Sequence, residues 1–151
     1  MVTTRGRALD VLVVSHEASR TGAPRVAVEV LRALSAAGLS VQCLLRWPGP
    51  LQDDLLRAAD GCRLEPLRRT RVLLRRFRRT RALAVRLEQR VARRVLLRTR
   101  PRSVYANTVL SACYVRPALR LGLPVVLHVH ELEPLTSSVL NRYGISGPVP
   151  G

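Results

Sequence analysis

The stretch Ala8–Leu34, ALDVLVVSHEASRTGAPRVAVEVLRAL, decides the fold class of this chain. It joins an apolar run, Val11–Val14, to a polar loop, Ser15–Thr21, and a helical pattern that begins after Gly22. An uninterrupted apolar run predicts a strand covered on both faces, since a strand with one wet face would alternate. Pro24 suits the first helical turn, where its missing N–H would have no partner. We therefore expect the first strand of a parallel sheet and a loop where such folds bind ligands.

The alternation of strand and helix patterns continues along the chain. Further strands are predicted at 41–45, 62–67, 103–106 and 125–129, and helices at 51–59, 70–98 and 109–121, with a possible helix after residue 132. This order predicts an α/β fold with a Rossmann-like, doubly wound and mostly parallel sheet. We expect a single domain over residues 1–135 and a Gly/Pro-rich tail or truncated linker over residues 136–151.

The composition fits one folded domain. Of the 151 residues 47% are hydrophobic, which is enough for a core and argues against disorder. No apolar run approaches the roughly 20 residues needed to span a bilayer, and no cleavable signal pattern precedes the first strand. A cytoplasmic location is therefore expected. The three cysteines are widely spaced and form no CxxC motif, so they suggest neither a disulfide framework nor a zinc knuckle.

Positive charge is concentrated in one segment. Residues 68–102 contain 15 arginines and one acid, Glu88, in a chain whose net charge is +16. Apolar residues keep a helical spacing through 70–98, which predicts an amphipathic helix. The arginines expected on its polar face include Arg69, Arg76, Arg79, Arg86, Arg90 and Arg93.

This basic face has two interpretations. It is either a solvated outer surface or a surface for an anionic partner. The mixture of arginine with Leu, Val and Phe suits the inner face of a membrane with anionic lipids, to which the chain would bind peripherally. Nucleic acid fits less well, because an aromatic content of 3% leaves few platforms for base stacking.

Polar residues follow three of the predicted strands. The candidate site residues are His16, Thr21, Gly22, Asn107, His130 and Glu131. Because the carboxyl ends of parallel strands share one edge of a sheet, we expect these residues to line one site. Gly22 could let the backbone of a helix N-terminus approach an anion, or it could be a turn residue. His130 could donate to a hydroxyl or phosphate, or be a surface histidine. No metal is expected, because His128 and His130 lack a well-placed third ligand.

Three motifs occur in order along the chain: SHEASRTGAPRVAVEVLRAL at 15–34, VYANT at 104–108 and LGLPVVLHVHELE at 121–133. Together they resemble the N-terminal half of family-4-type retaining glycosyltransferases of the GT-B fold. The resemblance implies that Gly22, with Thr21, approaches the donor diphosphate and the acceptor. It also implies that His130 is catalytic beside the transferred sugar and that Asn107 faces the acceptor. The implied partners are a nucleotide sugar and a sugar or lipid-linked acceptor, with no cofactor.

One feature of the resembling family is missing from this sequence. Its members bind the nucleotide sugar chiefly through a second Rossmann-like domain, with two glutamates separated by seven residues. No two glutamates of this chain have that spacing. We therefore expect an acceptor-binding half that is inactive alone, with the donor-binding domain supplied in cis or in trans. The alternative is a stand-alone module that binds an anionic membrane or RNA through its arginine-rich helix.

Overall fold

Five parallel strands form one sheet in the order β3-β2-β1-β4-β5 in the computed structural model, which describes residues 8–66 and 80–145. The strands are β1 (Val11–Ser15), β2 (Val41–Leu45), β3 (Gly61–Leu64), β4 (Ser103–Asn107) and β5 (Val125–His128). The central strand β1 pairs Val13 with Cys43 on one side and with Tyr105 on the other. The chain is therefore a single Rossmann-like α/β domain, as the alternating pattern predicts.

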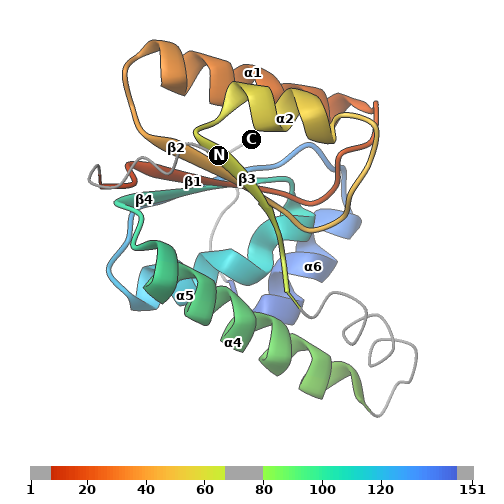
Figure 1. Ribbon diagram of the computed structural model, residues 1–151. Helices are drawn as coiled ribbons and strands as arrows, with labels where there is room; N and C mark the ends of the chain where they lie inside the picture. The colour runs from red at the N-terminus through yellow and green to blue at the C-terminus, as the bar shows by residue number, and fades with distance from the viewer. Residues whose placement is uncertain (1–7, 67–79, 146–151) are drawn as a thin grey trace.

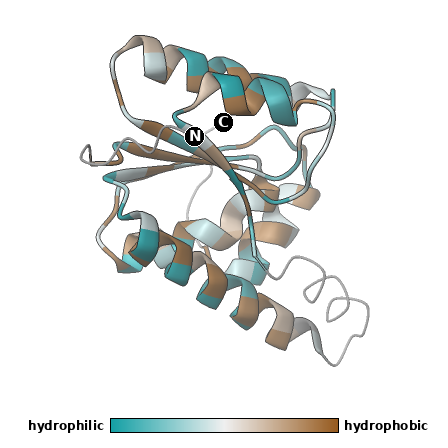
Figure 2. Cartoon of the chain, in the orientation of Figure 1, coloured by the Kyte–Doolittle hydropathy of each residue, from teal (hydrophilic) through white to brown (hydrophobic). Residues whose placement is uncertain are grey.

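Helices cover both faces of the sheet (Figure 1). On one face lie α1 (Gly22–Ala36) and α2 (Gln52–Ala58), and on the other lie α4 (Arg81–Thr99), α5 (Val115–Arg120) and α6 (Leu135–Tyr143). Each face has its own buried apolar cluster, one around Val13 and Leu31 and the other around Leu12 and Leu96. Figure 2 shows mostly hydrophobic strands between helices of mixed hydropathy. This two-sided cover explains why β1 is a continuous apolar run.

The segment that decides the fold has its predicted form. Val13 and Val14 of β1 are fully buried, and Pro24 lies buried in the first turn of α1. Gly38, with a φ of 79°, follows the end of α1, where a glycine accommodates the left-handed geometry without strain.

The expected helix over 109–121 is not one α-helix. A 3₁₀ helix, η2 (Val109–Tyr114), precedes α5. Pro117 explains the division, because it lacks an N–H and its ring would clash with the carbonyl group four residues earlier in a continuous α-helix. Since α5 begins at Val115, Pro117 falls within its first turn, where proline is tolerated. The third strand was also predicted too long: β3 ends at Leu64 rather than at residue 67.

The basic helix α4 begins at Arg81 and ends at Thr99. It buries Ala84, Val91 and Leu96 and exposes the opposite surface, so the amphipathic pattern is confirmed for the part that the structure describes. Arg69, Arg76 and Arg79 lie outside the described residues.

The helix expected after residue 132 is α6. Its Val139, Leu140 and Tyr143 are buried in the same cluster as Leu12, so the packed domain continues through this helix. Residues 146–151, the Gly/Pro-rich end of the sequence, are not among the described residues. Within the described ranges, no helix is both long enough and apolar enough to cross a membrane.

Candidate functional site

Loops that follow β1, β4 and β5 meet at the carboxyl edge of the sheet through the side chain of Asn107. Asn107 is fully buried, and its Nδ2 donates a hydrogen bond to the carbonyl oxygen of Ala23 at 2.8 Å. Its Oδ1 lies 3.1 Å from Nε2 of His130. One amide therefore joins the first turn of α1 to the loop after β5. The structure thus brings Asn107, His130 and the start of α1 together.

The hydrogen bonds of Asn107 also define the tautomer of His130. The carbonyl oxygen of Ala23 can only accept, so the amide nitrogen of Asn107 must face it and the amide oxygen must face His130. Nε2 of His130 therefore carries a proton and donates. In the neutral ring, the other nitrogen, Nδ1, is then a hydrogen-bond acceptor.

The surroundings of His130 favour its neutral form. Burial lowers the pKa of His130, and the neighbouring His128 lowers it further, although Glu131 acts in the opposite direction. The two imidazole rings are stacked with their centroids 4.0 Å apart. The ring of His128 is itself held by a hydrogen bond between its Nδ1 and the hydroxyl group of Tyr105. In its neutral form, His130 therefore presents Nδ1 as a hydrogen-bond acceptor.

Glu131 ties two of the loops together through its carboxylate. Its Oε2 accepts hydrogen bonds from the backbone N–H groups of Val109 and His130, both at 3.0 Å. Thr136 at the start of α6 donates to the carbonyl oxygen of Glu131 at 3.0 Å. The carboxylate therefore holds the start of η2 against the loop after β5, which orients the backbone of His130.

Thr108 is held in a conformation that β-branched residues rarely adopt. Its φ is 88°, and such backbone strain typically amounts to about 1–3 kcal/mol. Its N–H donates to the carbonyl oxygen of His128 at 2.8 Å, and its Oγ1 accepts from the N–H of Leu110 at 3.2 Å. These bonds keep the end of β4 beside the end of β5. The sequence carries no sign of this strain.

Gly22 lies at the N-terminus of α1 with open space around it. A Cβ atom added at this position would meet nothing within 4 Å, and Gly22 has helical geometry without a positive φ. A left-handed turn is therefore not the reason for a glycine here. The neighbouring Thr21 is exposed, and its hydroxyl group is 2.8 Å from that of Ser19. His16 lies half-buried at the start of the same loop.

A tight contact positions the loop after β1. A Cβ atom added to Gly49 would lie 2.5 Å from the carbonyl oxygen of Ala18, and the N–H of Leu51 donates to that oxygen at 2.8 Å. The loop after β2 therefore supports the loop that carries Thr21. In the sequence, Gly49 lies in a Pro-Gly-Pro stretch at 48–50, which indicates a break in regular structure but not this contact.

A buried charge network lies beneath the candidate site, and sequence reasoning missed it. Arg46, which follows β2, is 3% exposed. Its Nε donates to Glu65 at 3.0 Å, its Nη2 is 3.7 Å from Glu88 of α4, and its Nη1 donates to the carbonyl oxygen of Leu110 in η2. Tyr114 donates to Glu65 at 2.8 Å, and Tyr143 of α6 donates to Glu88.

This Arg46 network connects elements that are far apart in the sequence. It joins the end of β2 to α4, η2 and α6, and η2 directly follows Asn107 and Thr108. No motif or spacing in the sequence singles out Arg46, and Glu65 interrupts the apolar run of the third predicted strand. In the part of the chain that the structure describes, no group of three His, Cys, Asp or Glu residues is placed to hold a metal ion.

Comparisons with known proteins concern the family and the fold of this chain. The sequence profile of Glycosyltransferase Family 4 matches residues 20–148. Among solved structures, two of the C-terminal domain of a hydrogenase from Pyrococcus furiosus are similar, each with a TM-score of 0.54. They share 15% and 14% identity, and the alignments cover 85% and 80% of this chain and 99% and 91% of theirs. At such identities the likeness concerns the fold alone. A search of curated proteins found no match.

Proposed function

Because this chain belongs to Glycosyltransferase Family 4, we propose that it forms the acceptor-binding half of a GT-B enzyme that transfers a sugar from a nucleotide sugar with retention. The observation that supports this proposal is the bonding of Asn107 to both Ala23 and His130, which brings the start of α1 and the ring of His130 to one edge of the sheet.

The start of α1 suits the diphosphate of the donor. A helix N-terminus carries about half a positive charge and presents unpaired N–H groups. Pro24 has no N–H, so the amides of Gly22 and Ala23 are the ones that this helix start offers. With no side chain at Gly22, a phosphate can approach these amides closely. They would stabilise the negative charge that develops on the departing nucleoside diphosphate.

His130 suits a sugar hydroxyl group. Its unprotonated Nδ1 accepts a hydrogen bond, while Asn107 holds the ring from the other side. Glu131 acts as a positioning residue, because its Oε2 is engaged by two backbone N–H groups. Thr21 and His16 complete the wall formed by the first loop. In this proposal, a second Rossmann-like domain binds the nucleotide, either in the same polypeptide or in a partner.

A binding titration tests the proposal. The ring signals of His130 are followed by NMR while the chain is titrated with simple sugars and with nucleotide sugars. We expect a sugar acceptor to shift the His130 signals and to bind His130→Gln about 5- to 150-fold more weakly, since removal of one hydrogen-bond partner in a binding site amounts to about 1–3 kcal/mol.

Arg32→Gln is the matched control, because Arg32 is an exposed α1 residue remote from the carboxyl edge. Sugar binding that does not shift the NMR signals of His130 would refute the assignment of the acceptor site. An unchanged affinity of His130→Gln for the sugar would refute it as well. Transfer of sugar from a nucleotide sugar by this chain alone, measured by mass spectrometry, would refute the proposed division between two domains.

A further inference from the structure

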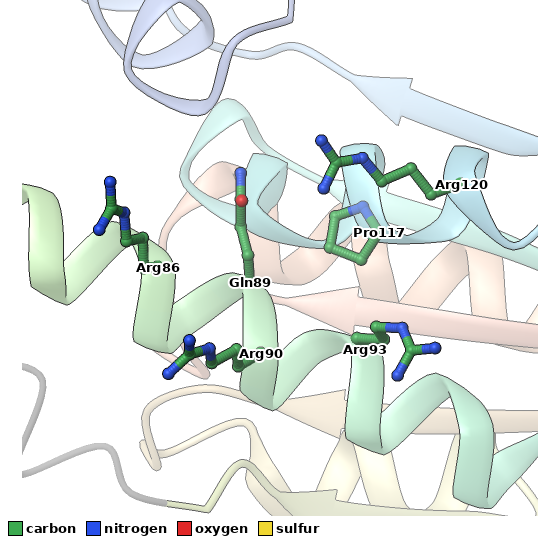
Figure 3. Close-up of a pocket in the computed structure, with 6 residues that line it drawn as sticks. All are labelled: Arg86, Gln89, Arg90, Arg93, Pro117 and Arg120. Carbon is green, nitrogen blue, oxygen red and sulfur yellow. The ribbon is translucent and has the colours of Figure 1, made fainter.

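A groove of about 210 Å³ lies between α4 and α5. It is lined by Arg86, Gln89, Arg90 and Arg93 of α4 and by Pro117 and Arg120 of α5 (Figure 3). Residues 86, 90 and 93 are spaced by four and three, so one face of α4 presents all three arginines. None of these residues belongs to the candidate sugar-transfer site.

The charge of this arginine groove is not neutralised locally. In residues 8–66 and 80–145, none of its four guanidinium groups forms an ion pair with a carboxylate. Glu88 of α4 does not compensate them, because it is 1% exposed and faces inward to Arg46 and Tyr143. The like charges of Arg86 and Arg90, one helical turn apart, repel each other. An anion between the two helices would relieve this repulsion.

A second hollow extends the positive surface. It encloses about 380 Å³, shares Arg86 and Gln89 with the groove, and adds Arg116 and Arg142. Arg116 precedes Arg120 by one turn of α5, so both helices contribute arginines to the two hollows. Gln89 lies between them, and its Nε2 donates to the carbonyl oxygen of Tyr143 at 3.4 Å.

The size and chemistry of the groove indicate which kind of ligand fits it. Pockets for drug-sized molecules enclose roughly 300–1,000 Å³, so 210 Å³ suits a small group rather than a whole nucleotide sugar. Guanidinium groups bind phosphate oxygens with paired, planar hydrogen bonds. We propose that the arginine groove is an accessory binding site for a phosphate or diphosphate group, separate from the site of sugar transfer.

The first test uses pyrophosphate as the probe at constant ionic strength, with affinity measured by calorimetry on the full chain. We expect pyrophosphate to bind, and the double substitution Arg90→Gln and Arg93→Gln to weaken binding at least about tenfold, since hydrogen bonds to charged groups are strong. The matched control is Arg94→Gln with Arg98→Gln, which removes the same charge from residues of α4 that do not line the groove.

Arg120→Gln provides an independent variant on the facing helix, and thermal melts establish that each variant is folded. We expect Arg120→Gln to weaken pyrophosphate binding and the control pair to change it by less than about twofold, because general charge attraction is screened by salt. Equal losses in the groove pair and the control pair would overturn the proposal, because they would indicate diffuse charge attraction.

The second test distinguishes a soluble phosphate ligand from a lipid headgroup. Vesicles of phosphatidylcholine with phosphatidic acid are compared with vesicles of phosphatidylcholine alone in a flotation assay. Groove-dependent binding to the phosphatidic acid vesicles identifies a lipid source, and groove-dependent binding of pyrophosphate without vesicle binding identifies a soluble source. Absence of both would overturn the proposal. None of these outcomes depends on His130, so the groove can fail while the proposed function stands.

Discussion

Removal of the buried cation Arg46 is the most demanding test of how this fold supports its site. Arg46→Met would leave Glu65 and Glu88, which are 2% and 1% exposed, facing each other without the guanidinium group between them. Breaking a buried ion pair by removing one partner typically destabilises a protein by about 3–5 kcal/mol. Because 1 kcal/mol lowers the Tm of a chain of this size by about 2–4 °C, the expected decrease is roughly 6–20 °C.

A triple variant tests whether the lost stability can be restored. Adding Glu65→Gln and Glu88→Gln to Arg46→Met removes two buried negative charges, while each glutamine oxygen can still accept from Tyr114 or Tyr143. We expect the triple variant to recover about half or more of the lost Tm, because neutral buried groups avoid most of the desolvation penalty.

Arg94→Met is the control for the loss of an arginine, since Arg94 is exposed on α4 and should change stability by no more than about 0.5 kcal/mol. Circular dichroism melts measure all three variants. A decrease for Arg46→Met no larger than that for Arg94→Met, or a triple variant less stable than the single one, would refute the electrostatic account of the network.

Three further predictions concern the candidate site. Gly22→Ala should keep or slightly raise the Tm, since the added Cβ meets nothing within 4 Å. The same substitution should weaken the binding of diphosphate, which NMR titration measures. A lowered Tm would contradict this prediction. Gly49→Ala should lower stability by about 1–3 kcal/mol in urea titrations, because its Cβ would collide with the carbonyl oxygen of Ala18; unchanged stability would argue against that contact. His128→Gln should raise the pKa of His130, which burial and then His128 hold below about 6.5. Because this folded-state pKa is lowered, the unfolded chain binds more protons near that pH, so His130 makes stability increase with rising pH there and decrease in acid. NMR titration of the ring measures the pKa and urea titrations at several pH values measure the stability; an unchanged pKa in the variant would exclude His128 as a cause.

The fold was predictable because its signals are local. The apolar run of β1, the proline in the first turn of α1 and the alternation of strands and helices each depend on neighbouring residues. Where the prediction was wrong, the cause was also local but was not taken into account: Pro117 divides the expected helix into η2 and α5. The meeting of Asn107, His130 and the start of α1 followed from one rule about parallel sheets.

The parts of the site that could not be predicted depend on long-range contacts. The contact of Arg46 with Glu88 and Leu110 joins residues far apart in the chain, and no spacing or motif in the sequence predicts it. The φ of Thr108 is likewise imposed by the bond of its N–H to His128 on the neighbouring strand. Sequence periodicity indicates which face of an element is buried, but it does not indicate which buried polar groups form hydrogen bonds or ion pairs with each other.

The site contains two kinds of residue, and substitutions should separate them. Asn107 and Glu131 are engaged with backbone groups of other loops, so their loss should affect stability and ligand binding together. Gly22 faces open space, and Nδ1 of His130 lies on the side of the ring opposite the bond to Asn107, so their substitution should affect binding more than stability. If Asn107→Ala weakened binding with no loss of stability, Asn107 would contact the ligand directly rather than position His130. If His130→Gln lowered the Tm as much as Asn107→Ala, the ring of His130 would be part of the fold, and the proposed acceptor contact would lose its support.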